Sequence, residues 1–200
     1  MDDVGRWVEG VRGGDERALE ALLERYLPEL HAYVRLRAGG MLLARESSAD
    51  LVQSVAREAL GELGGFDYQG EQAFRSWLYT LTQRKLVSRY RYHVAQRRDV
   101  GREIQLPQPG GGTSRAELDL ADSYAALVSP SRKLAAKQFV EQVEEAFAQL
   151  PDHYREIVLL ARAEGLTHEQ IAKRTGRGMG SVRMLLSRAL AELARQLDVK

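Results

Sequence analysis

The pattern of apolar residues in this chain is helical at both ends and breaks down between Val100 and about Pro130. On either side of the break, apolar residues recur at spacings of three and four, and strand signals are almost absent. The break contains Pro107, Pro109 and three glycines at 110–112, a composition typical of a flexible linker. The chain is therefore predicted to be all-α, with two small helical domains joined by a flexible linker: residues 1–99, 100–130 and 131–200.

The N-terminal half is predicted to contain three helices. The first runs from about Asp15, a candidate N-cap, to Arg35, and Pro28 is a point where it can kink or break. The second begins at one of the serines 47–48 and ends at a cluster of glycines. After a glycine-bounded loop at 64–70, a long third helix covers residues 71–98.

The C-terminal half has the pattern of a helix-turn-helix. Thr167 and Gln170 stand at the spacing of a capping box, and Gly176 supplies the turn after the short helix that they start. One side of the last helix is apolar and is expected to be buried in a core; it is formed by Val182, Leu185, Leu186, Ala189, Leu190 and Leu193. Its other side carries Ser181, Arg183, Met184, Ser187 and Arg188. Such a helix fits the major groove of DNA, and a plain pair of packed helices is the alternative.

The helix predicted at 71–98 has the second informative composition. Its aromatic residues interleave with basic ones: Trp77, Tyr79, Tyr90 and Tyr92 with Arg75, Arg84, Lys85, Arg89 and Arg91. This mixture suits unpaired bases that stack on rings while cations follow the backbone. Phe74, Trp77 and Leu78 share one helical face, however, and also fit a core. The two aromatics of the loop before this helix either tuck back into the domain or receive a flipped base.

The composition argues against several other classes of protein. The 29 basic and 28 acidic side chains nearly cancel, so a nucleic-acid surface must come from local segregation of charge. The chain has no cysteine, and its four histidines lack zinc-ligand spacing. There is no phosphate-binding glycine loop or nucleophile elbow, so no catalytic residue, metal or cofactor is expected. No apolar run approaches the roughly 20 residues of a membrane span, which favours a cytoplasmic protein.

Three stretches of the chain resemble the group IV, or extracytoplasmic-function, sigma factors of bacterial RNA polymerase. Asp50-Leu51-Val52-Gln53 is similar to the start of the core-binding helix of this family. The segment Phe74-Arg75-Ser76-Trp77-Leu78-Tyr79 is similar to its promoter-melting helix. Its fourth region is matched in order and spacing by Leu150-Pro151, Tyr154-Arg155-Glu156, Glu164-Gly165-Leu166-Thr167, Gln170-Ile171-Ala172 and Gly180-Ser181-Val182-Arg183.

The resemblance implies a sigma factor: a protein that is not itself an enzyme but confers promoter specificity on core RNA polymerase. Residues 1–99 would bind the largest subunit and the melted minus-10 strand, and residues 131–200 would bind the minus-35 duplex and the second-largest subunit. Family members are commonly held by an anti-sigma protein, although no residue here anchors that expectation.

The resemblance also assigns site residues by position. The polymerase-facing residues would be Asp50, Gln53, Ser54 and Arg57. The minus-10 residues would be Phe66, Asp67, Tyr68 and Gln69 in the specificity loop, with Arg75, Arg84, Lys85 and Arg89 supporting the melted strand. The minus-35 residues would be Arg177, Ser181, Arg183, Met184, Ser187 and Arg188.

Two other functions remain open from the residues alone. A stand-alone helix-turn-helix regulator would bind duplex DNA tightly without polymerase and use its N-terminal helices for dimerisation or sensing. A protein-interaction module would place its basic helices on acidic partners, and sequence preference for DNA would distinguish it from both other readings.

Overall fold

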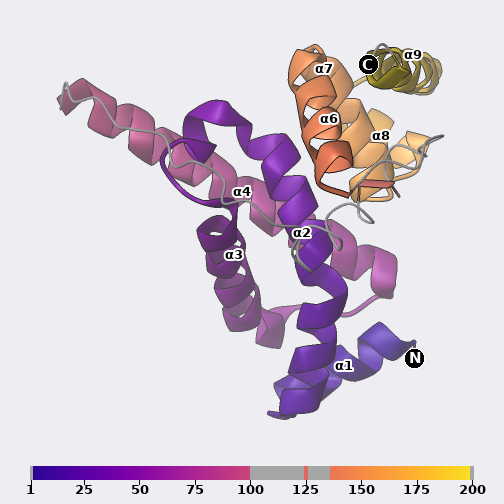
Figure 1. The fold of residues 1–200 in the computed structure, drawn as a ribbon. Coiled ribbons are helices and arrows are strands. Elements are labelled where there is room, and N and C mark those ends of the chain that lie inside the picture. The colour runs from indigo at the N-terminus through magenta and orange to yellow at the C-terminus, as the bar shows by residue number, and fades with distance from the viewer. Residues whose placement is uncertain (1, 100–123, 126–135, 199–200) are drawn as a thin grey trace. The chain divides into compact units, whose positions relative to one another are not determined.

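The structure, a computed structural model, describes residues 2–99, 124–125 and 136–198, and the described residues are helical with no strand (Figure 1). The chain divides into two compact units, Met1–Gly111 and Gly112–Lys200. The prediction of an all-α chain with two small helical domains is therefore confirmed. Most of the linker predicted at 100–130 lies outside the described residues.

The first unit opens with a helix that the sequence prediction did not assign. Helix α1 (Asp3–Arg12) is capped by Asp2, whose Oδ1 accepts a hydrogen bond from the Gly5 amide at 2.8 Å. Val4 and Val8 of α1 are buried. α1 packs against α2 (Glu16–Leu43), and Asp15 caps α2 as predicted, because its Oδ1 accepts from the Arg17 amide at 2.9 Å.

Helix α2 continues through Pro28 and ends eight residues beyond the predicted end at Arg35. A proline inside a helix removes one backbone hydrogen bond and costs about 3 kcal/mol. The residues around Pro28 lie against the rest of the unit: Leu22, Tyr26, Leu30 and Tyr33 are each at most 6% exposed. Burial of these side chains offsets the cost of the proline, so the helix does not break at this point.

Two further helices complete the first unit. Helix α3 (Ser48–Glu62) begins at the predicted serines, with the Ser47 hydroxyl accepting from the Asp50 amide at 3.1 Å. A short 3-10 turn, η1 (Leu63–Gly65), follows, and α4 (Glu71–Asp99) begins at the predicted residue. Helices α2, α3 and α4 pack on one another around a core of Leu51, Val52, Val55, Phe74, Leu78 and Leu81.

The described part of the second unit contains α6 (Ala136–Gln149), α7 (Asp152–Val158), the π-helical turn η2 (Leu159–Ala163), α8 (His168–Thr175) and α9 (Met179–Asp198). Its core contains the buried side chains of Ile157, Leu160, Ile171 and Val182. Helices α6, α7 and α8 all pack against α9. One face of α9 is thereby covered along its length.

The turn between α8 and α9 follows the predicted signals. Thr167 and Gln170 form a reciprocal capping box, with hydrogen bonds of 3.2 and 2.8 Å. Gly176 takes a left-handed conformation with φ of 67°, which residues with a Cβ rarely adopt. The second unit therefore contains the expected helix-turn-helix.

Tyr124 and Ala125 are the described residues that fall inside the predicted linker. The Tyr124 side chain is fully buried, and its hydroxyl donates to the Glu144 carboxylate on α6 at 2.7 Å. Within the stretch predicted to be a linker, this aromatic side chain is therefore anchored to the second unit.

Candidate nucleic-acid interface

The outward face of α9 carries the residues that the sequence assigned to duplex DNA. Ser181, Arg183, Ser187 and Arg188 are exposed, and so is Met184, which is 54% exposed. The apolar stripe faces the other way, with Val182 and Ala189 fully buried and Leu193 1% exposed. Within the described residues, neither Arg183 nor Arg188 forms an ion pair or a side-chain hydrogen bond. Both guanidinium groups are therefore available to an anionic or hydrogen-bonding partner.

The backbone at the N-terminal end of α9 is not covered by neighbouring side chains. Gly178 and Gly180 have nothing within 4 Å of the position that a Cβ would take. Arg177 is exposed beside them, and the Gly178 carbonyl accepts from the Val182 amide at 3.0 Å to begin the helix. Backbone can approach a partner closely at this end of the helix, where the free amides of the first turn also favour anions.

An ion pair between a buried carboxylate and a partly exposed guanidinium connects α8 to the end of the π-helical turn. The Glu164 side chain is 1% exposed, and its Oε2 accepts from Arg174 Nη1 at 2.6 Å. The π-helical bond from the Glu164 amide to the Leu159 carbonyl, at 3.0 Å, turns this side chain inward. Since Arg174 lies in the last turn of α8, the pair fixes the end of the helix that precedes the α8–α9 turn.

The first unit has an open cleft where the sequence placed the specificity loop. The cleft, about 690 Å³, lies between the end of α3, the loop after η1 and the first two turns of α4. Phe66, Asp67, Gln69 and Trp77 line it together with Glu62. An aromatic wall with carboxylate and amide groups at the rim can stack on a flat ring and hydrogen-bond to its edge.

The two aromatic residues of the loop pack back onto the unit. The Phe66 ring stacks on Trp77 with centroids 4.7 Å apart and planes 29° apart, and it meets Phe74 edge-on at 5.8 Å. Tyr68 is half-buried, and its hydroxyl donates to Asp2. Burial and the hydrogen bond to Asp2 raise the pKa of Tyr68 above its ordinary value. Of the two readings of the loop, the structure contains the tucked arrangement, and the cleft opens beside it.

The basic residues predicted to support the melted strand are in ion pairs. Arg75 pairs with Glu29 at 3.1 Å. Arg84 and Lys85 reach across to α3, where they pair with Glu62 at 2.9 Å and with Glu58 at 2.7 Å. Because these pairs neutralise the cations, a nucleic-acid backbone would have to compete with carboxylates for Arg84 and Lys85.

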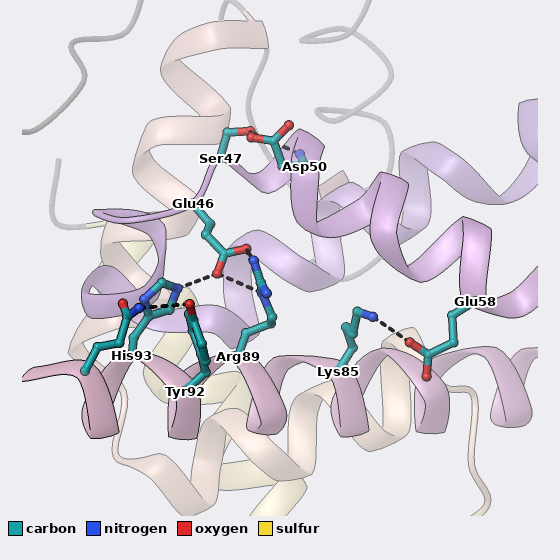
Figure 2. A network of polar contacts seen from close by, with 9 residues as sticks. Glu46, Ser47, Asp50, Glu58, Lys85, Arg89, Tyr92 and His93 are labelled. Carbon is teal, nitrogen blue, oxygen red and sulfur yellow. Dashed lines mark hydrogen bonds and ion pairs between the residues drawn. The ribbon is translucent and has the colours of Figure 1, made fainter.

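Arg89 belongs to a cluster around the partly buried Glu46 carboxylate (Figure 2). Its guanidinium donates hydrogen bonds from Nε and Nη2 to the two carboxylate oxygens of Glu46, at 2.8 to 2.9 Å. His93 contacts the same carboxylate, and the Glu46 and His93 side chains are 12% and 11% exposed. Burial acts to raise the pKa of Glu46, but the hydrogen bonds from Arg89 and His93 outweigh it and lower that pKa. The cluster ties the turn before α3 to the middle of α4.

Replacing Glu46 by glutamine is expected to lower the free energy of unfolding of the first unit by about 2 kcal/mol near neutral pH. Because the folded-state pKa of Glu46 is lowered, its contribution is present above the usual glutamate value of 4.5 and is lost as the pH falls through the lower folded-state value. The variant should therefore lose stability less steeply than the wild type in acid. Both tryptophans, Trp7 and Trp77, lie in this unit, so their fluorescence measures its unfolding.

Glu62→Gln is the matched control for this prediction. It removes a second ion pair between α3 and α4, but Glu62 and Arg84 are 44% and 59% exposed, so the expected loss is below about 1 kcal/mol. Equal losses in the two variants, or an unchanged acid slope in Glu46→Gln, would contradict the role assigned to the buried carboxylate.

Tyr79 does not take the role suggested by its place among basic residues. Its side chain is 2% exposed, lies 4.7 Å from the Tyr33 ring and donates to Glu29 at 3.3 Å. A buried ring cannot stack on a base, so this part of the prediction is wrong. Tyr90 and Tyr92, at 47% and 51% exposure, are accessible.

The residues assigned to polymerase form one exposed face of α3. Asp50, Gln53 and Arg57 recur at spacings of three and four and are exposed, with Ser54 half-buried beside them. Leu60 continues this face and is 39% exposed, an unusual exposure for a large apolar side chain. The face can therefore bury both charged and apolar surface against a partner.

Three residues of these surfaces were left out of the site residues assigned from the sequence. Trp77 was weighed mainly as core, yet it lines the cleft; Glu62 follows the core-binding stretch and was not singled out. Arg91 is exposed between Tyr90 and Tyr92 and has no ion pair within the described part of α4. Its place between two aromatics was the signal that could have put it among the site residues.

Two kinds of site are absent from the described residues. No group of three or more histidine, aspartate or glutamate side chains there is arranged to hold a metal ion. No helix among the described residues has the length and apolar character needed to cross a bilayer.

Comparison with known families gives two matches. Residues 22–96 match the family model for sigma-70 region 2, and residues 140–193 match the model for sigma-70, region 4. The two matches fall one in each compact unit. They cover the cleft with the α3 face in the first unit and the helix-turn-helix in the second.

Similar proteins cover nearly the whole chain. The RNA polymerase sigma-H factor of Pseudomonas aeruginosa is 28% identical over 196 residues, which are 96% of this chain and 92% of that protein. The RNA polymerase sigma factor YlaC of Bacillus subtilis is 24% identical over 180 residues, 90% of this chain and 92% of that protein. The sigma factor RpoE of Bartonella quintana, solved with the anti-sigma factor NepR, has a similar fold, with a TM-score of 0.55, 21% identity, and coverage of 91% of this chain and 98% of that one.

Proposed function

This chain belongs to the sigma-70 family of bacterial RNA polymerase sigma factors, in group IV, and we propose how its two units divide the reading of a promoter. As a sigma factor it confers promoter specificity on RNA polymerase in transcription initiation. The first unit, in the proposal, holds polymerase and the melted minus-10 strand, and the second holds the minus-35 duplex. The supporting observation is that the units carry different surfaces: an aromatic cleft in one and a basic helix face in the other.

The face of α9 suits duplex DNA. Arg183 and Arg188 are exposed and have no partner among the described residues, and the short side chains of Ser181 and Ser187 let the helix approach base edges closely. A guanidinium can bridge guanine O6 and N7 or pair with a phosphate. Arg177, at the open entry to α9, fits a phosphate contact, and Met184 fits an apolar contact such as a thymine methyl group.

The cleft of the first unit suits a single flipped base. Phe66 and Trp77 supply a stacking wall, and Asp67, Gln69 and Glu62 supply acceptors and a donor at the rim. A base flipped out of the melted strand would stack on these two rings, while the rest of the strand stays outside the cleft. Arg84, which is 59% exposed, is the predicted strand contact that exchanges its carboxylate partner for a phosphate most readily. Lys85 and Arg89 are more enclosed and, in this proposal, hold α4 in place.

The exposed face of α3 would bind core polymerase through Asp50, Gln53, Ser54 and Arg57, with Leu60 adding apolar contact. An anti-sigma protein is a second proposed partner, since the RpoE relative was solved with one. Synthesis of RNA belongs to core polymerase, so this chain acts as a DNA-binding subunit in the cytoplasm, without a catalytic residue or cofactor of its own.

The test is transcription from a library of promoter sequences with purified core polymerase, with and without this chain. The chain is expected to produce transcripts that start at defined positions downstream of a shared pair of elements. A stand-alone regulator would instead bind duplex DNA tightly by itself and leave start sites unchanged. That outcome would overturn the proposed function.

A further inference from the structure

Helix α1 contacts the loop that borders the cleft at two separate points. From the C-terminal end of α1, Arg12 donates to the Leu63 carbonyl from Nε and Nη2, at 3.2 Å each, and Nη2 also donates to the Phe66 carbonyl. At the N-terminal end, Asp2 accepts from the Tyr68 hydroxyl. One helix thus holds the backbone before Asp67 and the side chain after it.

The α1 helix is itself firmly seated, so these contacts restrain the loop. Val8 is fully buried, and a Cβ at Gly10 would lie 2.6 Å from the Cβ of Ala18 on α2. Asp2 is held in turn, because its Oδ1 also caps α1 at the Gly5 amide. Hydrogen bonding by Tyr68 and Gly5 lowers the pKa of Asp2, so the carboxylate stays ionised and keeps accepting near neutral pH.

Arg12 also supplies a donor to a loop carbonyl that lies outside the helical pattern. Phe66 has extended backbone at the end of η1, so its carbonyl leaves the helical pattern. A charged donor on that carbonyl restrains the residue more strongly than a neutral one. Phe66, Asp67 and Gln69 line the cleft, so the position of this backbone sets where the stacking ring and the rim groups lie.

We propose that α1 is a brace that fixes the shape of the base-receiving cleft, with Arg12 and Asp2 as its positioning residues. This inference rests on the proposed function of the cleft. Helix α1 precedes residues 22–96, the stretch that matches sigma-70 region 2. The brace therefore lies outside the matched region and acts on a loop inside it.

The experiment measures base selectivity in the complex of core polymerase with the full chain. Single-stranded probes carry the minus-10 sequence found in the promoter library, with each of the four bases at each position, and compete for the complex. Arg12→Ala is expected to reduce the preference for the best base at one position by about tenfold. Affinity for core polymerase should stay at the wild-type level, which unfolding of the first unit would not allow. Affinity for minus-35 duplex, which the second unit binds, should be unchanged as well.

Arg6→Ala is the matched control, because Arg6 is on the same helix in an exposed pair with Asp3, 65% exposed, and does not touch the loop. It should retain wild-type selectivity. Tyr68→Phe removes the other end of the brace while keeping the ring, and it should lower selectivity in the same direction as Arg12→Ala. If tryptophan fluorescence shows that Arg12→Ala unfolds the first unit, Tyr68→Phe decides the question.

Two outcomes distinguish failure of the proposed brace from failure of the proposed base-binding role of the cleft. The brace is wrong, and the cleft assignment stands, if Gln69→Ala reduces base selectivity while Arg12→Ala leaves it unchanged. If Arg12→Ala unfolds the first unit, Tyr68→Phe takes its place in this comparison. If the wild type shows no base preference and Gln69→Ala has no effect, the cleft assignment itself fails and the brace fails with it.

Discussion

Arg174→Ala is expected to destabilise the helix-turn-helix unit by about 3–5 kcal/mol. The substitution leaves the Glu164 carboxylate, which is 1% exposed, without the guanidinium that lies 2.6 Å away. A buried carboxylate that loses a charged donor keeps its desolvation cost, so the loss exceeds that of an ordinary surface pair. Circular dichroism should show an early transition, while tryptophan fluorescence, which reports only the first unit, should keep its wild-type midpoint.

Lys173→Ala is the matched control for Arg174→Ala. Lys173 precedes Arg174 on α8 and pairs with Glu169 at 3.0 Å, but the two side chains are 77% and 69% exposed. Its loss should change stability by no more than about 0.5 kcal/mol. A combined Glu164→Met and Arg174→Leu variant should recover much of the lost stability. If Arg174→Ala were no worse than Lys173→Ala, the buried pair would not hold the unit together.

Arg183→Ala is expected to weaken binding to minus-35 duplex by about 1–3 kcal/mol, the range for loss of a bidentate base contact. Arg183 lies on the exposed face of α9 and has no intramolecular partner among the described residues, so alanine removes a contact to DNA without breaking one in the protein. Arg188→Ala is expected to act in the same way. Fluorescence anisotropy with the wild-type element and with single-base variants measures both changes.

The form of the loss identifies what each arginine contacts. Loss of a base contact relaxes the preference at one position, whereas loss of a phosphate contact weakens all sequences alike and lowers the salt slope by about 1. Arg195→Ala is the control on the same helix, because Arg195 pairs with Glu192 in the last turns of α9. Its affinity for DNA should equal that of the wild type. Unchanged DNA binding by both Arg183→Ala and Arg188→Ala would contradict the proposal that α9 recognises the minus-35 duplex.

The features that the sequence predicted correctly are local. A capping box needs two side chains three residues apart, and the left-handed turn at Gly176 needs one glycine. The stripe of α9 is likewise set by helical spacing, and its buried and exposed sides are those expected. Such signals are carried by neighbours in the sequence, so no knowledge of tertiary packing is required to interpret them.

The features that the sequence missed depend on partners far away along the chain. Pro28 is tolerated because other helices bury its neighbours, and Tyr79 is lost to the core because Tyr33 packs on it. The sequence alone suggests that Arg84 and Lys85 are free cations, whereas in the structure α3 places carboxylates beside them. The contacts of Arg12 span 51 and 54 residues, and no local pattern predicts them.

The central claim, that one unit reads duplex and the other captures a melted base, is tested most directly by measuring both steps on one promoter. Polymerase carrying wild-type chain, Arg183→Ala or Gln69→Ala is mixed with a promoter that reports minus-35 occupancy by anisotropy and minus-10 opening by 2-aminopurine fluorescence. Arg183→Ala should lower occupancy, and opening should recover when the complex is saturated. Gln69→Ala should leave occupancy unchanged and reduce opening even at saturation. The same defect in both variants would contradict the division between the two units.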